Sequence, residues 1–137
     1  LILSKYSHYK KAKILVVEDN KINQLIVNKQ LDFQGITCDF ADDGLLALSY
    51  LENTTPDLIL MDLQMPNMDG FTAASLIKEN RKLQNIPIVI LSASVSNEDK
   101  EQASILGIDD FISKPCYQED LVAILDKYLK ASINTTD

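Results

Sequence analysis

The sequence lacks a long apolar run: nowhere in its 137 residues does an apolar stretch approach the ~20 residues that a membrane-spanning helix needs. It also has little positive charge: 13 lysines and arginines stand against 20 aspartates and glutamates, a net charge of −7. Because affinity for a nucleic-acid backbone depends on clustered basic residues, this balance argues against direct nucleic-acid binding. The composition therefore predicts no membrane contact by this segment and no nucleic-acid partner.

Cysteine and histidine are scarce as well. Cys38 and Cys116 have neither metal-ligand spacing nor a disulfide pattern, which is typical of reduced thiols in a cytoplasmic protein. The single histidine, His8, lies outside the expected core. The chain starts at Leu1 without a methionine or a signal peptide, so we interpret it as a cytoplasmic domain of a longer protein.

Short apolar runs alternate with segments of helical periodicity. The runs predict strands at 14–17, 37–41, 58–61, 88–91 and 110–112, and the intervening segments predict helices near 20–34, 43–53, 70–80, 96–106 and 118–130. This alternation is typical of an α/β protein with a doubly wound parallel sheet. We expect one domain over residues 11–130, with tails at 1–10 and 131–137.

Local motifs mark several element ends. Gly35 and Gly107 stand where helices are expected to end, and Ser96 followed by Asp99 predicts a helix start. The sequence "NMDG" at 67–70 predicts a turn, in which Gly70 is free to adopt a positive φ.

Polar residues follow the expected strands at one end. They are Glu18 and Asp19 after the first strand, Asp62 at the end of the third, Ser92 after the fourth and Lys114 after the fifth. In an open parallel sheet, the binding site lies beyond the carboxyl ends of the strands, where the strand order reverses. We therefore expect these side chains to meet at one edge of the sheet.

The chemistry of this set favours phosphoryl transfer. Three neighbouring carboxylates repel one another unless a cation lies among them, and an all-oxygen set without histidine or cysteine favours Mg²⁺. Lys114 and Ser92 offer a cation and a hydroxyl donor for phosphate oxygens. Asp62 is then the candidate nucleophile that forms an acyl phosphate. An alternative for the stretch 18–20 is that it only caps the following helix.

Four segments resemble the receiver domain of two-component response regulators: "ILVVEDNKINQ", "LILMDLQMPNMDG", "IVILSAS" and "FISKP". The resemblance covers about residues 11–130. It implies a flavodoxin-like (βα)5 fold with strand order 2-1-3-4-5 and phosphoryl transfer from a phosphohistidine. "EDNKINQ" together with "MDLQMPNMDG" is most similar to receivers of hybrid sensor histidine kinases. Such a receiver can belong to the cytoplasmic part of a membrane-bound kinase, and the sequence leaves open whether this chain does.

The resemblance also implies roles for particular residues. The Mg²⁺ ligands are implied to be the carboxylates of Glu18, Asp19 and Asp62 and the backbone carbonyl of Gln64. Asp62 is the implied phosphoacceptor, and Lys114 is the implied phosphoryl-binding lysine. The peptide bond between Lys114 and Pro115 is implied to be cis, which directs the lysine side chain inward. Ser92 and Phe111 form the implied conformational switch, with serine and phenylalanine in place of the commoner threonine and tyrosine.

The expected first helix carries apolar residues on two opposite faces. Ile22, Leu25, Ile26 and Phe33 form one stripe, whereas Val27 and Leu31 lie nearly opposite. We expect one face to cover the sheet and the other to stay exposed, although a fully covered helix is the alternative. The resemblance implies that a histidine kinase or histidine phosphotransfer domain docks near this helix. In the last helix, a simpler stripe predicts core residues: Leu121, Ile124, Leu125 and Tyr128.

Other functions compete with a phosphoacceptor switch. A metal-dependent phosphatase of the haloacid-dehalogenase type also uses an aspartyl nucleophile, but it needs a second aspartate two residues later, where this chain has Gln64. A flavin-binding module leaves the acidic pair and the lysine unexplained. A receiver that acts by binding alone usually lacks one of the acids or the lysine. A domain that phosphorylates its own aspartate is an enzyme only in a narrow sense, whereas a parent hybrid kinase is an enzyme outright.

Overall fold

The computed structural model describes residues 11–108 and 110–129. Within that part, five strands and five helices alternate along the chain: β1 (Ile14–Val17), α2 (Lys21–Phe33), β2 (Cys38–Ala41), α3 (Gly44–Leu51), β3 (Leu58–Asp62), α4 (Gly70–Glu79), β4 (Ile88–Ser92), α5 (Asn97–Ile105), β5 (Phe111–Ser113) and α6 (Gln118–Tyr128). Every predicted element is present, with bounds shifted by a few residues at most. The two predicted tails and His8 lie outside the described residues.

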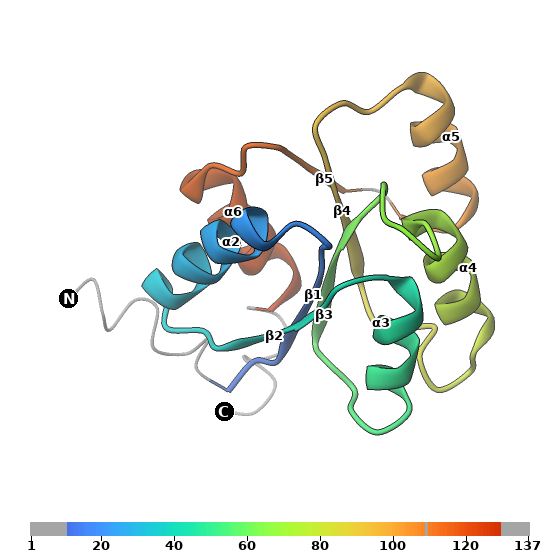
Figure 1. Ribbon diagram of the computed structural model, residues 1–137, viewed down its shortest axis with the longest axis horizontal. Coiled ribbons are helices and arrows are strands. Elements are labelled where there is room, and N and C mark those ends of the chain that lie inside the picture. Colours follow the sequence, from blue (N-terminus) through green and yellow to red (C-terminus); the bar gives the residue numbers. More distant parts are fainter. Residues whose placement is uncertain (1–10, 109, 130–137) are drawn as a thin grey trace.

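The strands form one parallel sheet in the order β2-β1-β3-β4-β5. Helices α2 and α6 cover one face of the sheet, and α3, α4 and α5 cover the other (Figure 1). The flavodoxin-like order that the resemblance implied is therefore confirmed. The strand order reverses between β1 and β3, so their carboxyl ends flank the position where a ligand site is expected.

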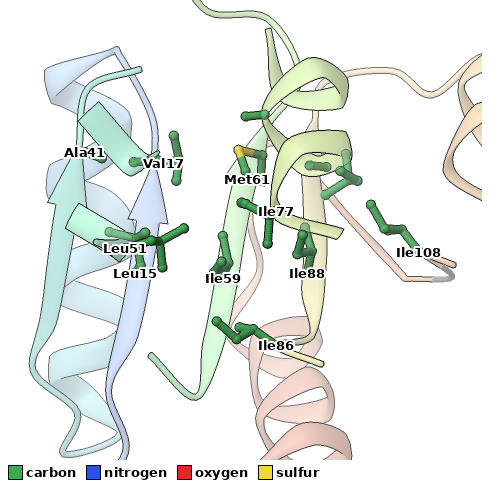
Figure 2. Close-up of a cluster of buried hydrophobic side chains, with 14 of the residues drawn as sticks. Leu15, Val17, Ala41, Leu51, Ile59, Met61, Ile77, Ile86, Ile88 and Ile108 are labelled. Carbon is green, nitrogen blue, oxygen red and sulfur yellow. The ribbon is translucent and has the colours of Figure 1, made fainter. Parts of the chain in front are cut away.

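Two apolar cores hold the layers together. The residues of β1, β3 and β4 are buried throughout and alternate between the two faces, as the near-continuous apolar runs of a parallel sheet require. Leu15, Ile59 and Ile77 belong to the cluster under α3, α4 and α5 (Figure 2). Val16 and Leu60 point to the opposite cluster, under α2 and α6. Each such side chain contributes about 1.5–3 kcal/mol relative to an exposed one.

Most of the predicted helix ends are confirmed. Gly35 and Gly107 have φ values of 79° and 76°, the left-handed conformation that favours glycine after a helix. Ser96 and Asp99 form a reciprocal capping box at the start of α5. None of the helices in the described part of the chain has both the length and the apolar character that crossing a membrane requires.

The two cysteines are free thiols and are partly buried. Burial raises the pKa of Cys38 and of Cys116 to about 11, and a neighbouring aspartate adds to the effect in each case. Both thiols are therefore protonated and poorly nucleophilic at neutral pH.

Candidate functional site

Three acidic side chains converge at the carboxyl ends of β1 and β3. Glu18 and Asp19 directly follow β1, and Asp62 is the last residue of β3, the adjacent strand. Each offers a carboxylate oxygen, and these oxygens lie within 4.8 Å of one another. Glu18 and Asp62 are buried, with 1% and 6% of their surface exposed, whereas Asp19 faces solvent. The site thus combines two buried acids with one that solvent can reach.

Lys114 approaches this cluster from the loop between β5 and α6. Its Nζ lies 2.6 Å from Glu18 Oε1 and 3.2 Å from Asp62 Oδ2. The Lys114 amide donates to the Ser92 carbonyl oxygen over 3.0 Å, and the bond between Lys114 and Pro115 is cis, as predicted. Burial lowers the pKa of Lys114, but the contacts with the Glu18 and Asp62 carboxylates outweigh burial and raise it overall. The Lys114 ammonium group therefore relieves part of the repulsion among the carboxylates. The sequence analysis had attributed that relief to a metal ion alone.

The remaining donor atoms suit a hard divalent cation such as Mg²⁺. Within the described ranges, no basic side chain or hydrogen-bond donor contacts the Asp19 carboxylate. Asp62 Oδ1 accepts only a long bond of 3.3 Å, from the Gln64 amide. A carboxylate-only donor set with solvent access matches the way Mg²⁺ binds in proteins, through few carboxylates and several waters. The residues present therefore fit this ion.

The start of α2 fixes the acidic pair. Asn20 Oδ1 accepts bonds of 2.9 Å and 3.0 Å from the amides of Ile22 and Asn23, so the helix cap is Asn20 and the Asp19 carboxylate stays available. Gln24 donates from one amide nitrogen to the Glu18 carbonyl oxygen at 2.6 Å and to Asp42 Oδ1 at 2.8 Å. The sequence analysis did not predict this contact of Gln24 with the acidic pair. The only indication in the sequence was that Gln24 lies one helical turn after the cap residue.

The predicted switch residues lie on adjacent strands, Ser92 at the end of β4 and Phe111 at the start of β5. Ser92 is buried, and its hydroxyl donates to the Ser94 carbonyl oxygen over 2.6 Å. Phe111 is half-buried and packs against the core under α3, α4 and α5. Phe111 also lines a surface cavity of about 380 Å³ together with Val95 and Ala123. The aromatic side chain therefore has both packed and open surroundings.

The loop between β3 and α4 departs from the expected turn. Gly70 does not have a positive φ; Asn67 does, at 66°. A Cβ on Gly70 would lie 2.3 Å from the Asp62 carbonyl oxygen, so glycine is required there by close packing and not by its backbone angles. Asp69 is the N-cap of α4, where its side chain accepts from the Thr72 amide at 2.9 Å.

Helix α2 has the two apolar faces predicted from the sequence. Val27 and Leu31 are buried against the sheet. The four residues of the other stripe are exposed by 42% to 69%: Ile22, Leu25, Ile26 and Phe33. On α6, Leu121, Ile124 and Leu125 are buried, as predicted, whereas Tyr128, the fourth predicted core residue, is only half-buried against the same cluster. In the part of the chain that the structure describes, α2 is therefore not fully covered, contrary to the alternative that the sequence left open.

Comparisons with known proteins agree with this architecture. A family model described as the response regulator receiver domain matches residues 14–126. Hybrid signal transduction histidine kinase G of Dictyostelium discoideum is 40% identical over 131 residues, which cover 93% of this chain but only 4% of that kinase. The chain thus spans a small part of this relative.

Two solved structures are informative for the site. The receiver domain of sensor histidine kinase PA1611 from Pseudomonas aeruginosa, which has a magnesium ion coordinated in its active site cleft, is 32% identical with a TM-score of 0.78, covering 85% of this chain and 96% of that one. The receiver domain of Ssk1 from Saccharomyces cerevisiae, crystallised with the histidine phosphotransfer protein Ypd1, gives 32% identity and a TM-score of 0.78 over 87% and 89% of the two chains. The sheet order, the acidic cluster with its lysine and these matches together show that the chain belongs to the response regulator receiver domain family of two-component signalling.

Proposed function

We propose that this domain accepts a phosphoryl group on the Asp62 carboxylate from a phosphohistidine, in a Mg²⁺-dependent reaction. The observation that carries this proposal is the position of Asp62 at the end of β3, 3.2 Å from the Lys114 ammonium group and within 4.8 Å of two further acids. The donor is a histidine kinase or a histidine phosphotransfer protein. The chain then acts as a cytoplasmic relay or switch domain, as part of a hybrid histidine kinase.

Four groups would hold the ion: the carboxylates of Glu18, Asp19 and Asp62 and the backbone carbonyl of Gln64. When bound, Mg²⁺ supplies positive charge that neutralises the phosphoryl oxygens. The magnesium ion in the PA1611 receiver supports the same choice of ion here. Asp19, which lacks a partner within the described ranges, is the acid that remains to be neutralised.

The side chains of this chain account for the rest of the transfer. An Asp62 oxygen attacks phosphorus as the bond from phosphorus to the donor imidazole breaks, and the electron pair of that bond stays on the imidazole nitrogen. Lys114, held by Glu18 and Asp62 in the resting site, is placed to pair with a phosphoryl oxygen. The Ser92 hydroxyl supplies a hydrogen bond to another. Hydrolysis of an external phosphate ester is disfavoured, since the amide protons of Gln64 are far too weakly acidic for it to act as a general acid.

Intact mass spectrometry after treatment with acetyl phosphate tests this proposal. The wild-type chain should gain one phosphoryl group in the presence of Mg²⁺ and none in the presence of a chelator. Asp19→Asn should require more Mg²⁺ for the same extent of labelling. Equal labelling with and without chelator would refute the role of the ion.

The phosphoryl group should also change the conformation around Ser92. To reach a phosphoryl oxygen, the Ser92 hydroxyl must leave the Ser94 carbonyl, and the Phe111 ring can then turn inward. Addition of Mg²⁺ and beryllofluoride should shift the NMR signals of Phe111, α5 and α6. Ser92→Ala should still bind beryllofluoride but lose most of these remote shifts. Equal remote shifts in wild type and Ser92→Ala would contradict this switch.

The exposed face of α2 is the proposed docking surface for the phosphodonor. It is apolar and exposed, and the complex of Ypd1 with the Ssk1 receiver shows that a domain of this fold binds a histidine phosphotransfer protein. Leu25→Glu should slow phosphoryl transfer from phosphorylated Ypd1 by about tenfold or more, the effect of losing a central interface residue.

Labelling by acetyl phosphate should be unchanged in Leu25→Glu, because that small donor needs no docking surface. The control is Ile105→Glu, which changes an apolar residue on α5, on the other face of the sheet, that is even more exposed than Leu25, at 81% against 54% (Figure 1). An equal loss in both variants, or none in Leu25→Glu, would argue against docking at α2.

A further inference from the structure

The loop between β3 and α4 contains a γ-turn centred on Asn67. The Met68 amide donates to the Pro66 carbonyl oxygen over 2.7 Å, and Asn67 between them has a φ of 66°. A γ-turn with positive φ is rare and strained, and strain of this kind persists only where the surroundings hold it in place. The contacts of Asn67 should therefore explain why the loop keeps this shape.

The Asp43 carboxylate supplies the contact. Asp43 Oδ2 accepts a bond of 2.7 Å from the Asn67 side-chain amide, and Asp43 Oδ1 accepts one of 2.9 Å from the Leu46 amide at the start of α3. Asp43 is only 7% exposed. The Leu46 amide and the Asn67 amide hold the pKa of Asp43 below its usual range, so the carboxylate is ionised and both bonds are charge-assisted. One side chain thus ties the β3–α4 loop to the start of α3.

The neighbouring residues pack in the same place. A Cβ on Gly44 would lie 2.9 Å from Met68 Cγ and 3.0 Å from the Met68 carbonyl oxygen. The first turn of α3 therefore lies directly against the loop, and the Asp43 bond to Asn67 forms across a close contact. The loop has little freedom to move on this side.

The other end of the loop reaches the acceptor. The Gln64 amide, three residues before Asn67, donates to Asp62 Oδ1, and the Gly70 amide donates to the Leu63 carbonyl oxygen over 2.9 Å. A shift at Asn67 would therefore be transmitted to Gln64 through a short segment that is fixed at its far end by Gly70. The Gln64 carbonyl is also one of the four proposed Mg²⁺ ligands.

We propose that Asp43 and Asn67 are a pair of positioning residues that fix the Gln64 backbone at the metal site. This inference rests on the proposed function for the role of Mg²⁺, but the pair itself can be tested in the metal-free protein. Neither residue touches the phosphoryl group or the ion; both act through the loop. Groups that orient metal ligands typically change metal affinity by about 10–100-fold when they are lost.

Exchanging the two side chains separates this role from helix capping. Asparagine and aspartate are equally good N-caps, and both tolerate positive φ, so the substitutions leave the local backbone preferences intact. Asn67→Asp places two carboxylates opposite each other and breaks the bond. The double variant Asp43→Asn/Asn67→Asp restores it, with the new amide at position 43 as the donor. Asp43→Asn alone should have little effect, because the Asn67 side chain can turn its oxygen toward the new amide.

Two measurements follow on these variants and the wild type. The first is amide hydrogen exchange at Gln64 and Met68 in the metal-free protein, followed by NMR. Exchange should be faster in Asn67→Asp and return to the wild-type rate in the double variant. The second is Mg²⁺ affinity by calorimetry. The dissociation constant should rise about tenfold in Asn67→Asp and return to near the wild-type value in the double variant.

The direction of the second effect is informative because Asn67→Asp adds a negative charge, which by itself would tighten Mg²⁺ binding. Unchanged exchange at Gln64 in Asn67→Asp would overturn the positioning role, whatever happens to Mg²⁺. A double variant that stays as impaired as Asn67→Asp would overturn it as well. If the wild type binds no Mg²⁺, the proposed function fails, whereas the exchange measurement still decides the role of the pair.

Discussion

Lys114→Met should lower the free energy of unfolding of the metal-free protein by about 2–3 kcal/mol. The substitution keeps an unbranched side chain of similar length but removes the ammonium group that contacts both Glu18 and Asp62. These carboxylates are 1% and 6% exposed, so each would be left buried, unpaired and close to another negative charge. Removing one partner of a fully buried pair costs about 3–5 kcal/mol, and the 22% exposure of the Lys114 side chain places this site below that range.

Chemical denaturation with and without Mg²⁺ measures this effect. Because the ion would neutralise the same carboxylates, adding Mg²⁺ should stabilise Lys114→Met more than it stabilises the wild type. Lys127→Met is the matched control, since Lys127 pairs with Asp110 over 2.7 Å but is 57% exposed, and exposed pairs contribute about 0–1 kcal/mol. A metal-free Lys114→Met as stable as Lys127→Met would contradict the assignment of Lys114 as the resting counter-ion of the site.

Gly70→Ala should impair both folding and phosphorylation. The new methyl group would lie 2.3 Å from the Asp62 carbonyl oxygen and 3.0 Å from the Leu63 Cα, and both are backbone atoms that cannot rotate away. The start of α4 must therefore move away from the end of β3. Forcing an extra group into a close-packed contact typically costs about 1–3 kcal/mol, and more where only backbone can yield. Because the displaced strand end carries Asp62, labelling by acetyl phosphate should also fall.

Gly107→Ala is the control for glycine replacement in general. Gly107 has a φ of 76° and open space around it, so alanine there is strained by about 1–2 kcal/mol without a steric clash and far from the acceptor. Thermal melts should rank Gly70→Ala as the less stable variant, and only Gly70→Ala should lose phosphoryl labelling. Normal labelling of Gly70→Ala would show that α4 can shift without moving the acceptor.

Periodicity was sufficient to predict the strands and helices and their parallel arrangement, whereas the order of the strands came from the resemblance to receiver domains. Strands β1, β3 and β4 are buried on both faces, so their sequences are unbroken apolar runs, and α2 shows its buried and exposed faces as two separate stripes. The rule that ligands bind beyond the carboxyl ends of parallel strands then brought Glu18, Asp62 and Lys114 to one place. These inferences succeed because they depend on local sequence and on topology, which apolar patterning largely determines.

Contacts between loops could not be predicted in the same way. Asp43 and Asn67 are 24 residues apart, and each residue type is common in turns, so no local pattern indicates that they meet. Gly70 illustrates a second limit: glycine suits either a positive φ or a close approach, and the sequence does not distinguish between them. The pairing of Lys114 with Glu18 likewise depends on how far each side chain extends, which is set by packing.

The central claim is that Asp62 receives the phosphoryl group. Acyl phosphates are reduced by borohydride to alcohols, so reduction after acetyl phosphate treatment, followed by peptide sequencing in a mass spectrometer, identifies the modified carboxylate. We predict conversion of Asp62 alone, dependent on Mg²⁺ and absent from Asp62→Asn. Modification of a different residue in the wild type, or undiminished labelling of Asp62→Asn, would contradict the account.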